Sequence, residues 1–395
     1  MQLGKNPYYS TIAGFCLVSI GLCLCRYAYA PMVPAMIAEG WIDKGGAAYL
    51  GAFNALGYLV GTIAAILLPG RWPLRDILRA SIIVAFVSVV MAAWNFGFAW
   101  LALARTLTGL AGASLVVHAP SLALAPVPDC WKKPAGGAIF AGAGMTILLV
   151  SLAMPGFLAQ SVGAGWLFEA FLGLVAGAVA WPLTATASKP RNSLERRPPL
   201  DPQPRKALFM LGAAYFLAAV GITPHTMFLT DYLHRDLSMA AASSVHYYGL
   251  IGVGTSCGAL AAGAAARMFG TPPSLSVNYL LGAVAVTAVL LGDNPLIISF
   301  SVVAIGFFLL ACVTLSSQRT AEIAGLPNHA YYWGLMTLAF SAGLTIGNYG
   351  LAWLIDRGGS YRATFEVAAA CLGAGFFISL ALQRVAGGTD ADKTR

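Results

Sequence analysis

Long apolar stretches separated by short polar segments recur along the whole chain. Each stretch has roughly the 20 residues that a helix needs to cross a bilayer. We therefore expect an all-α integral membrane protein with an even number of spans, which places both termini on one side. The twelve predicted transmembrane helices are residues 9–36, 47–69, 76–97, 99–125, 134–159, 165–187, 207–232, 241–267, 273–292, 295–319, 330–355 and 362–384.

One polar segment is longer than the others and divides the spans into six and six. Residues 188–206 read SKPRNSLERRPPLDPQPRK, with five prolines and six basic residues. Such a sequence disfavours a regular helix and favours an extended linker. We predict a six-helix N-terminal bundle (residues 1–187), a cytoplasmic linker (188–206) and a six-helix C-terminal bundle with a short tail (207–395). Two such halves are typical of transporters with a midplane site.

The composition and the placement of charge support a multi-pass membrane protein. The 395 residues are 58% hydrophobic and 10% charged, whereas soluble domains are about 25% charged. The net charge of +8 comes from basic residues in loops, which favours contact with lipid head groups and not with nucleic acid. Because the loops opposite the termini hold only Lys44, Arg235, Arg357 and Arg362, we predict that both termini are cytoplasmic.

Arg26 lies inside the first apolar stretch, where a charge costs at least about 2.5–3.5 kcal/mol. Pro31 and Pro34 follow it and should bend or loosen the helix. On a regular α-helix Tyr29 shares the face of Arg26, whereas Tyr27 does not. An arginine beside a tyrosine can bind a carboxylate, sulfonate or phosphate. We therefore predict that Arg26 and Tyr29 contact a solute. The alternative is that Arg26 binds helix backbone carbonyls or pairs with an acidic residue.

Other polar residues within or beside the apolar stretches extend this candidate site. Asn54 and Tyr58 are four residues apart and share a helix face, so they either contact solute or join helices. His225 follows Pro224 in the seventh stretch, which corresponds to the first stretch in the other half, and a neutral imidazole can carry a proton. We predict that these three residues bind solute. The candidates for coupling or gating are Arg105, His246 and Asp231, with a structural role as the alternative for Arg105 and His246.

Acidic side chains are scarce within the apolar stretches, with Glu169 near the start of the sixth and Glu366 near the start of the twelfth. Cationic solutes usually need a buried carboxylate, so this scarcity favours an anionic or neutral solute. The sequence lacks the phosphate-binding motif Gly-x4-Gly-Lys-Ser/Thr and the zinc motif His-Glu-x-x-His. We therefore predict no cofactor, no metal site and no enzymatic activity.

Several segments in both halves share motifs with one branch of a transporter superfamily. The sequence resembles the YbfB/YjiJ-type bacterial branch of the major facilitator superfamily (MFS). The resemblance rests on GLCLCRYAYAPMVPAM (residues 21–36), GAFNALGYLVG (51–61), TPHTMFLTDYLHRDL (223–237) and the run from YYWGLMTLAF to GGSYRATF (331–365). ARTLTGLAG (104–112) also resembles the superfamily's Arg-x-x-x-Gly pattern. The resemblance implies a bacterial cytoplasmic (inner) membrane protein that transports solutes by alternating access.

These observations predict a secondary transporter of a small organic anion, working as a symporter or antiporter, with proton coupling left open. The expected partners are the solute, membrane lipids and protons, and we expect a monomer. One alternative is an exporter of hydrophobic or amphipathic compounds. Another, from a different class, is a membrane sensor or membrane enzyme. The aromatic content of 11% would suit the first of these alternatives, because an exporter of hydrophobic compounds needs a pliable cavity.

Overall fold

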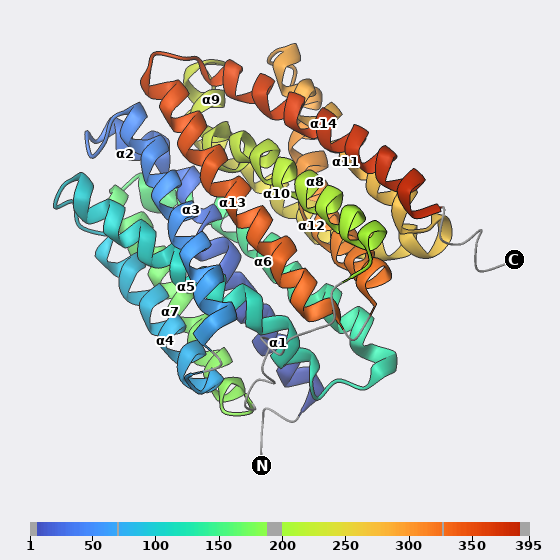
Figure 1. Ribbon diagram of the computed structural model, residues 1–395. Coiled ribbons are helices and arrows are strands. Elements are labelled where there is room, and N and C mark those ends of the chain that lie inside the picture. The colour runs from blue at the N-terminus through green and yellow to red at the C-terminus, as the bar shows by residue number, and fades with distance from the viewer. Residues whose placement is uncertain (1–5, 69–70, 188–199, 326–327, 388–395) are drawn as a thin grey trace, which may run out of the picture.

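The computed structural model describes residues 6–68, 71–187, 200–325 and 328–387, and in this part of the chain long helices are joined by short turns and loops, with no strand (Figure 1). The N-terminal helices are α1 (Pro7–Val18), the π-helical η2 (Ser19–Leu24), the 3₁₀-helical η3 (Tyr27–Met32), α2 (Val33–Ala38), α3 (Lys44–Leu67), α4 (Leu74–Met91), α5 (Phe98–Leu124), α6 (Asp129–Leu158) and α7 (Val162–Thr184). The later helices are α8 (Pro202–Thr223), the π-helical η5 (Pro224–Phe228), α9 (Leu229–Arg235), α10 (Ala241–Phe269), α11 (Thr271–Ala288), the 3₁₀-helical η6 (Val289–Leu291), α12 (Pro295–Ala324), α13 (His329–Asp356) and α14 (Tyr361–Gly387).

Most of these helices are long and apolar enough to cross a bilayer. Ten segments of the described chain meet that requirement, and α10 makes eleven if its two parts, bent by 42° to each other, count as one span. Helix α4 has the required length, but Arg75, Asp76 and Arg79 lie in its first two turns. The chain is therefore an all-helical, multi-pass membrane protein.

The start of α8 corrects the predicted extent of the linker. The sequence predicts extended chain up to residue 206, but α8 begins at Pro202. The first turn of a helix tolerates Pro202 and Pro204 because the N–H groups there have no intrahelical acceptor. Residues 188–199 of the predicted linker lie outside the described residues.

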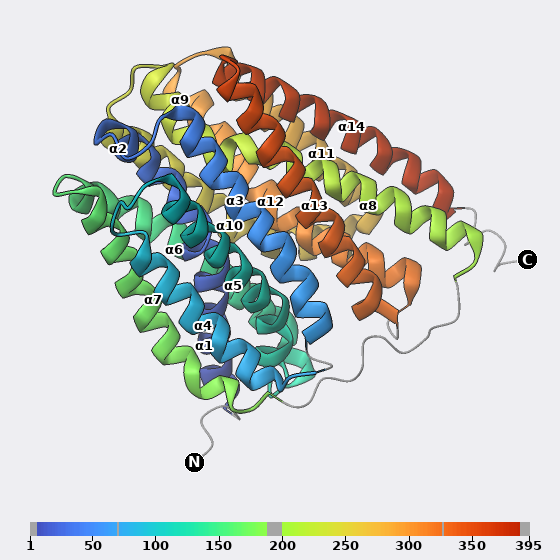
Figure 2. The same ribbon diagram turned by 60° about the vertical axis from the view of Figure 1, so that its left-hand side comes forward.

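Most helix packing lies within the earlier helices, α1 to α7, or within the later helices, α8 to α14, and two helix pairs make most of the contacts between these two groups. These pairs are α3 with α13 and α6 with α10. Figures 1 and 2 both show α3 running beside α13. In the second pair the backbones touch, because a Cβ added to Gly252 would lie 2.3 Å from the carbonyl oxygen of Gly144. Such close approach of helices in lipid requires small residues at the contact.

The helices over the predicted first and seventh spans, residues 7–38 and 202–235, are irregular, and their irregular parts contact each other. The first changes from α- to π- to 3₁₀-helix around Arg26 and contains Pro31, as the sequence predicts. The seventh has a π-helical segment that begins at Pro224. Thr230 donates a hydrogen bond to the carbonyl of Ala30 (2.6 Å), so the two broken spans meet where α2 and α9 lie side by side. We call this end of the molecule, at the upper left of Figure 1, the α2–α9 end.

We expect Gly252→Ala to destabilise the protein by about 1–3 kcal/mol, because the new methyl group would force α6 and α10 apart. Gly263 lies on the same helix with no atom within 4 Å of an added Cβ. The matched control Gly263→Ala should therefore leave stability unchanged or raise it slightly. Melting temperatures of the detergent-solubilised variants test this. Equal melting temperatures for the two variants would contradict the proposed backbone contact.

Candidate functional site

Arg26 lies at the break in the first span, buried among aromatic rings. Its backbone has φ −138° and ψ −61°, so the chain leaves the helical path there. The guanidinium carbon lies 5.3 Å from the ring centroid of Tyr27 and 5.8 Å from that of Tyr58 on α3. Only 3% of the residue is exposed, and Nε and Nη2 have no hydrogen-bond acceptor among the described residues. The site therefore holds a buried cation with unused donors.

The ring beside Arg26 is that of Tyr27, which the sequence analysis places on another face, and not that of Tyr29. This prediction was wrong because it assumed α-helical spacing, and the chain passes from π- to 3₁₀-helix at this point. The Tyr29 ring lies instead under Arg105 of α5, 4.4 Å from the guanidinium carbon. The hydroxyl of Tyr29 donates to the carbonyl of Ala47 on α3 (2.9 Å), which fixes the ring in that position.

Arg105 is the second buried guanidinium of the site. Its Nε, Nη1 and Nη2 atoms have no acceptor among the described residues. Trp166 of α7 lies 6.4 Å from the Tyr29 ring, centroid to centroid, and its Nε1 also has no acceptor there. Six nitrogen donors on Arg26, Arg105 and Trp166 are thus buried without an acceptor in the described part of the chain. Unpaired buried charge is strongly destabilising, so the arrangement favours binding of an anion that supplies several oxygen atoms.

Glu169 of α7 is a functional candidate that the sequence analysis passed over. The residue is fully buried, and neither carboxyl oxygen has a donor among the described residues. Arg105 is the cation that acts on it electrostatically, yet the two form no direct ion pair in the described structure. A cavity of about 10 Å³, close to the volume that one water needs, is lined by Glu169 and Cys25 together with apolar residues of α4.

The sequence indicates that Arg105 and Glu169 lie at the same depth in the membrane. Phe98 begins α5 and Arg105 lies seven residues further on, whereas Val162 begins α7 and Glu169 also lies seven residues further on. Because α6 returns the chain between them, α5 and α7 start from the same end of the bundle. The two charges therefore lie at the same depth, about 10 Å along each helix.

The side chain of Asn54 on α3 forms hydrogen bonds to the first span and to α5. Its side-chain nitrogen lies within 3.0 Å of three acceptors, namely the carbonyl of Cys25, the carbonyl of Arg105 and the hydroxyl of Thr108. These contacts hold the broken first span and α5 against α3 beside both arginines. Asn54 therefore positions the two guanidinium groups, which is the interhelical role that the sequence analysis gave as the alternative to solute contact.

His225 packs between helices of the later part of the chain, where its side chain contacts α12 and α14. Its Nε2 is 2.9 Å from the hydroxyl of Ser301 on α12, and its ring meets Phe365 of α14 at 5.1 Å. Ser301 donates its single hydroxyl proton to Ala285 (2.6 Å), so Nε2 of His225 must carry a proton and donate. The described contacts of His225 thus place it in a packed interior, and the structure does not bring it to Arg26.

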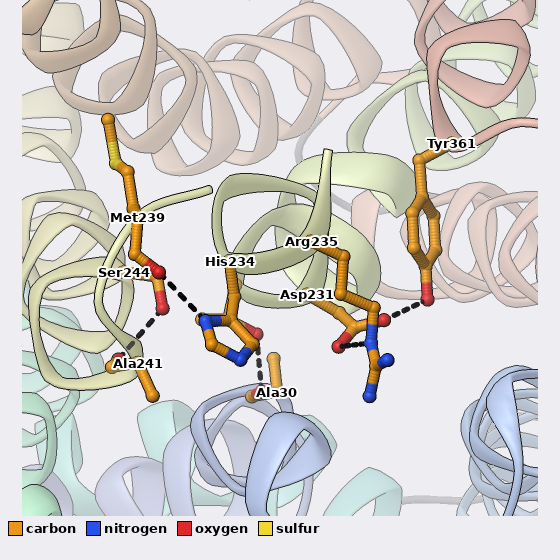
Figure 3. A network of polar contacts seen from close by, with 9 residues as sticks. Ala30, Asp231, His234, Arg235, Met239, Ala241, Ser244 and Tyr361 are labelled. Atoms are coloured by element: carbon orange, nitrogen blue, oxygen red, sulfur yellow. Dashed lines mark hydrogen bonds and ion pairs between the residues drawn. The ribbon is translucent and has the colours of Figure 1, made fainter. Parts of the chain in front are cut away.

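Asp231 lies in a polar network at the α2–α9 end, and Figure 3 shows it between Arg235 and Tyr361. Arg235 donates to Oδ1 at 2.8 Å, and the hydroxyl of Tyr361 donates to Oδ2. Lys44 of α3 lies 4.0 Å above the Tyr361 ring, so a side chain from the first half covers the network. His246, by contrast, is exposed in the second turn of α10.

A family comparison identifies the family of the chain, and a structural comparison supports its fold. The model of a family described as "Uncharacterised MFS-type transporter YbfB" matches residues 18–381. A crystal structure of a mutant of the nucleoside transporter NupG is similar, with a TM-score of 0.71 and 12% sequence identity, covering 94% of this chain and 99% of that one. At this identity the likeness supports the fold alone. No curated protein matches the chain.

We expect the bonds of Asp231 to be strongly coupled. Asp231→Asn and Tyr361→Phe each remove a charge-assisted hydrogen bond, worth about 1.5–3 kcal/mol. The double variant should lose less than the sum of the single losses, with a coupling of about 0.5–3 kcal/mol. Melting temperatures of the four proteins give the coupling, and Asp293→Asn in an exposed loop is the control. Additive losses would mean that the two side chains stabilise the protein independently.

Proposed function

Because the chain belongs to the YbfB-type family of major facilitator superfamily transporters, we propose that it moves a small organic anion across a membrane by alternating access. Membership in this family makes it a multi-pass membrane transporter and not an enzyme. The observation that carries the proposal of an anion is the set of six buried donors on Arg26, Arg105 and Trp166 that have no acceptor among the described residues.

The donors and the rings around them define the chemistry of a suitable solute. A carboxylate, sulfonate or phosphate offers two or three oxygens in the fork geometry that a guanidinium binds. The rings of Tyr27, Tyr29 and Tyr58 already lie against the guanidinium groups, so a flat or apolar body would suit the same space. We propose Arg26 and Arg105 as the anion-binding residues, with Tyr29, Tyr58 and Trp166 beside them and Asn54 holding the backbone in place.

We propose twelve spans in two bundles, residues 1–187 and 202–395, with a cytoplasmic linker between them and both termini in the cytoplasm of a bacterial cell. The placement of basic loops supports this orientation. Two pairings between the halves, α3 with α13 and α6 with α10, support a two-bundle arrangement, as do the breaks in the corresponding first and seventh spans. The proposed transporter is a monomer surrounded by lipid and is coupled to protons.

In this orientation the α2–α9 end faces the outside of the cell, and the described structure corresponds to a state closed on that side. Tyr248 donates to the carbonyl of Tyr27 (3.0 Å), and Thr230 donates to that of Ala30, so the first span is bonded to the seventh and eighth there. Within the described residues no comparable packing joins α1 to α8 at the opposite end. Rocking of the halves about the arginines would then open and close the path.

His225 and Asp231 have other roles in this proposal. His225 stabilises the packing of η5 against α12 and α14 in its neutral form, and Asp231 holds the outer network together. Since α9 contacts both α2 and η3, breaking that network would loosen the closed end. We therefore propose Asp231 as a gating residue and not as part of the anion site.

A thermal-shift screen of the purified protein tests the proposed solute class. Carboxylates, sulfonates and phosphates should raise the melting temperature, because a ligand that binds only the folded protein stabilises it. Sugars and nucleosides, which lack an ionised acid group, should leave it unchanged. Stabilisation by neutral compounds alone would contradict an anion site.

Arg26→Ala and Arg105→Ala should each weaken binding of a stabilising anion at least about tenfold, since each loses a charge-assisted pair. Lysine at either position should recover only part of the affinity, because it lacks the planar fork. Uptake of the same anion into proteoliposomes provides the functional measurement. Arg357→Ala, an exposed arginine stacked on Trp353, is the matched control. Normal uptake by Arg26→Ala would overturn the assignment.

A further inference from the structure

We propose that Glu169 is the proton-binding group of this transporter. Ionised Glu169 and the transported anion would bind Arg105 in turn. The inference rests on the proposed transport of an anion and adds the residue that would couple it to protons. It starts from the one acid of α7, whose two carboxyl oxygens are buried without a donor among the described residues.

The surroundings of Glu169 make it a site where a proton can bind and leave. An ionised carboxylate without donors is strongly disfavoured in an apolar interior, so the carboxyl group must either hold a proton or pair with a cation. The charged and titratable groups that act on it or lie against it are Arg105 from α5 and Cys23 and Cys25 from the first span. The residues of α4 that line its cavity, Ile82, Ala85, Phe86 and Val89, are apolar.

On α7 itself, and on the described membrane-spanning parts of α4 and α6, no other titratable group competes for this role. Glu169 is the only titratable residue of α7, and residues 135–158 of α6 contain none. The charges of α4 are confined to its first two turns, and Arg79 there bonds Thr184 at the opposite end of α7. Arg26 acts on Arg105 electrostatically, so it belongs to the same charged cluster. Arg105 is therefore the cation available to an ionised Glu169.

These contacts give a coupling cycle that conserves charge. In the solute-free state of this cycle, which differs from the described structure, ionised Glu169 pairs with Arg105. When an anion binds Arg105, Glu169 loses its counter-charge and takes up a proton from water, for which the cavity beside it has room. Release of the anion restores the pair and frees the proton. For a monoanion the site holds the same net charge when loaded and when empty, so one proton and one anion cross together without net charge.

Infrared spectroscopy of the purified protein tests the proton site without any solute. The band of a protonated carboxyl group should disappear as the pH is raised, and Glu169→Gln should lack the part of that signal that Glu169 contributes. Glu366→Gln is the control, because Glu366 is exposed on α14 and pairs with Arg362. If the wild-type protein and Glu169→Gln give the same titrating band, the proposal is overturned.

Addition of anions tests whether Arg105 changes its partner from Glu169 to the anion. The same experiment separates this inference from the proposed function. With benzoate, benzenesulfonate or inorganic phosphate present, the protonated band of Glu169 should persist to higher pH. If no anion shifts the wild-type melting temperature, the anion site fails, but the infrared titration still decides the proton site. If an anion stabilises the protein without moving the Glu169 band, the anion site stands and the exchange is wrong.

Transport measurements give a third readout. A gradient of one pH unit can drive about tenfold accumulation of an anion that crosses with one proton. Wild-type proteoliposomes should show such accumulation of a stabilising anion. Glu169→Gln should lose it yet still exchange labelled for unlabelled anion, which also shows that the variant is folded. Accumulation by Glu169→Gln equal to that of the wild type would overturn the role of Glu169.

Discussion

Two buried guanidinium groups with unused donors are the constraint on which the rest of the site depends. Arg26 and Arg105 leave five nitrogen atoms without an acceptor among the described residues, in the interior of an apolar bundle. A cluster of that kind is stable only if the surrounding structure holds it or a ligand completes it. Asn54 holds the backbone around both residues, and three tyrosine rings lie against their charges. The broken first span supplies Arg26 and two of those rings.

The sequence predicts the helices well because the bilayer imposes a simple rule on length and polarity. The predicted span 99–125 corresponds to α5 (Phe98–Leu124), and 47–69 corresponds to α3 (Lys44–Leu67). The prolines near Arg26 also indicate the irregular helix correctly. Side-chain neighbours within such a helix follow no fixed spacing, which is why the Tyr29 prediction failed. Tyr29 lies against the guanidinium group of Arg105 on α5. The spacing of residues on one helix cannot predict a contact with a second helix.

Contacts between helices were harder to predict than the helices themselves. Asn54 and His225 both lie inside the spans as expected, but their partners on neighbouring helices decide what they do. The sequence predicts that His225 corresponds to Arg26 in the other half, yet its ring packs against Ser301 and Phe365. Glu169 shows the opposite case, since its distance along α7 matches that of Arg105 along α5. Comparing the depths of charges across helices would have identified that pair from the sequence.

The proposed anion site and the proposed proton site share Arg105, so transport and coupling depend on which negative group this residue holds. The most direct test is a high-resolution structure of the protein with a stabilising anion bound. The account predicts density for the acid group of that anion between the guanidinium groups of Arg26 and Arg105, with Glu169 no longer facing a cation. An anion bound elsewhere, with Arg105 paired to Glu169 throughout, would contradict it.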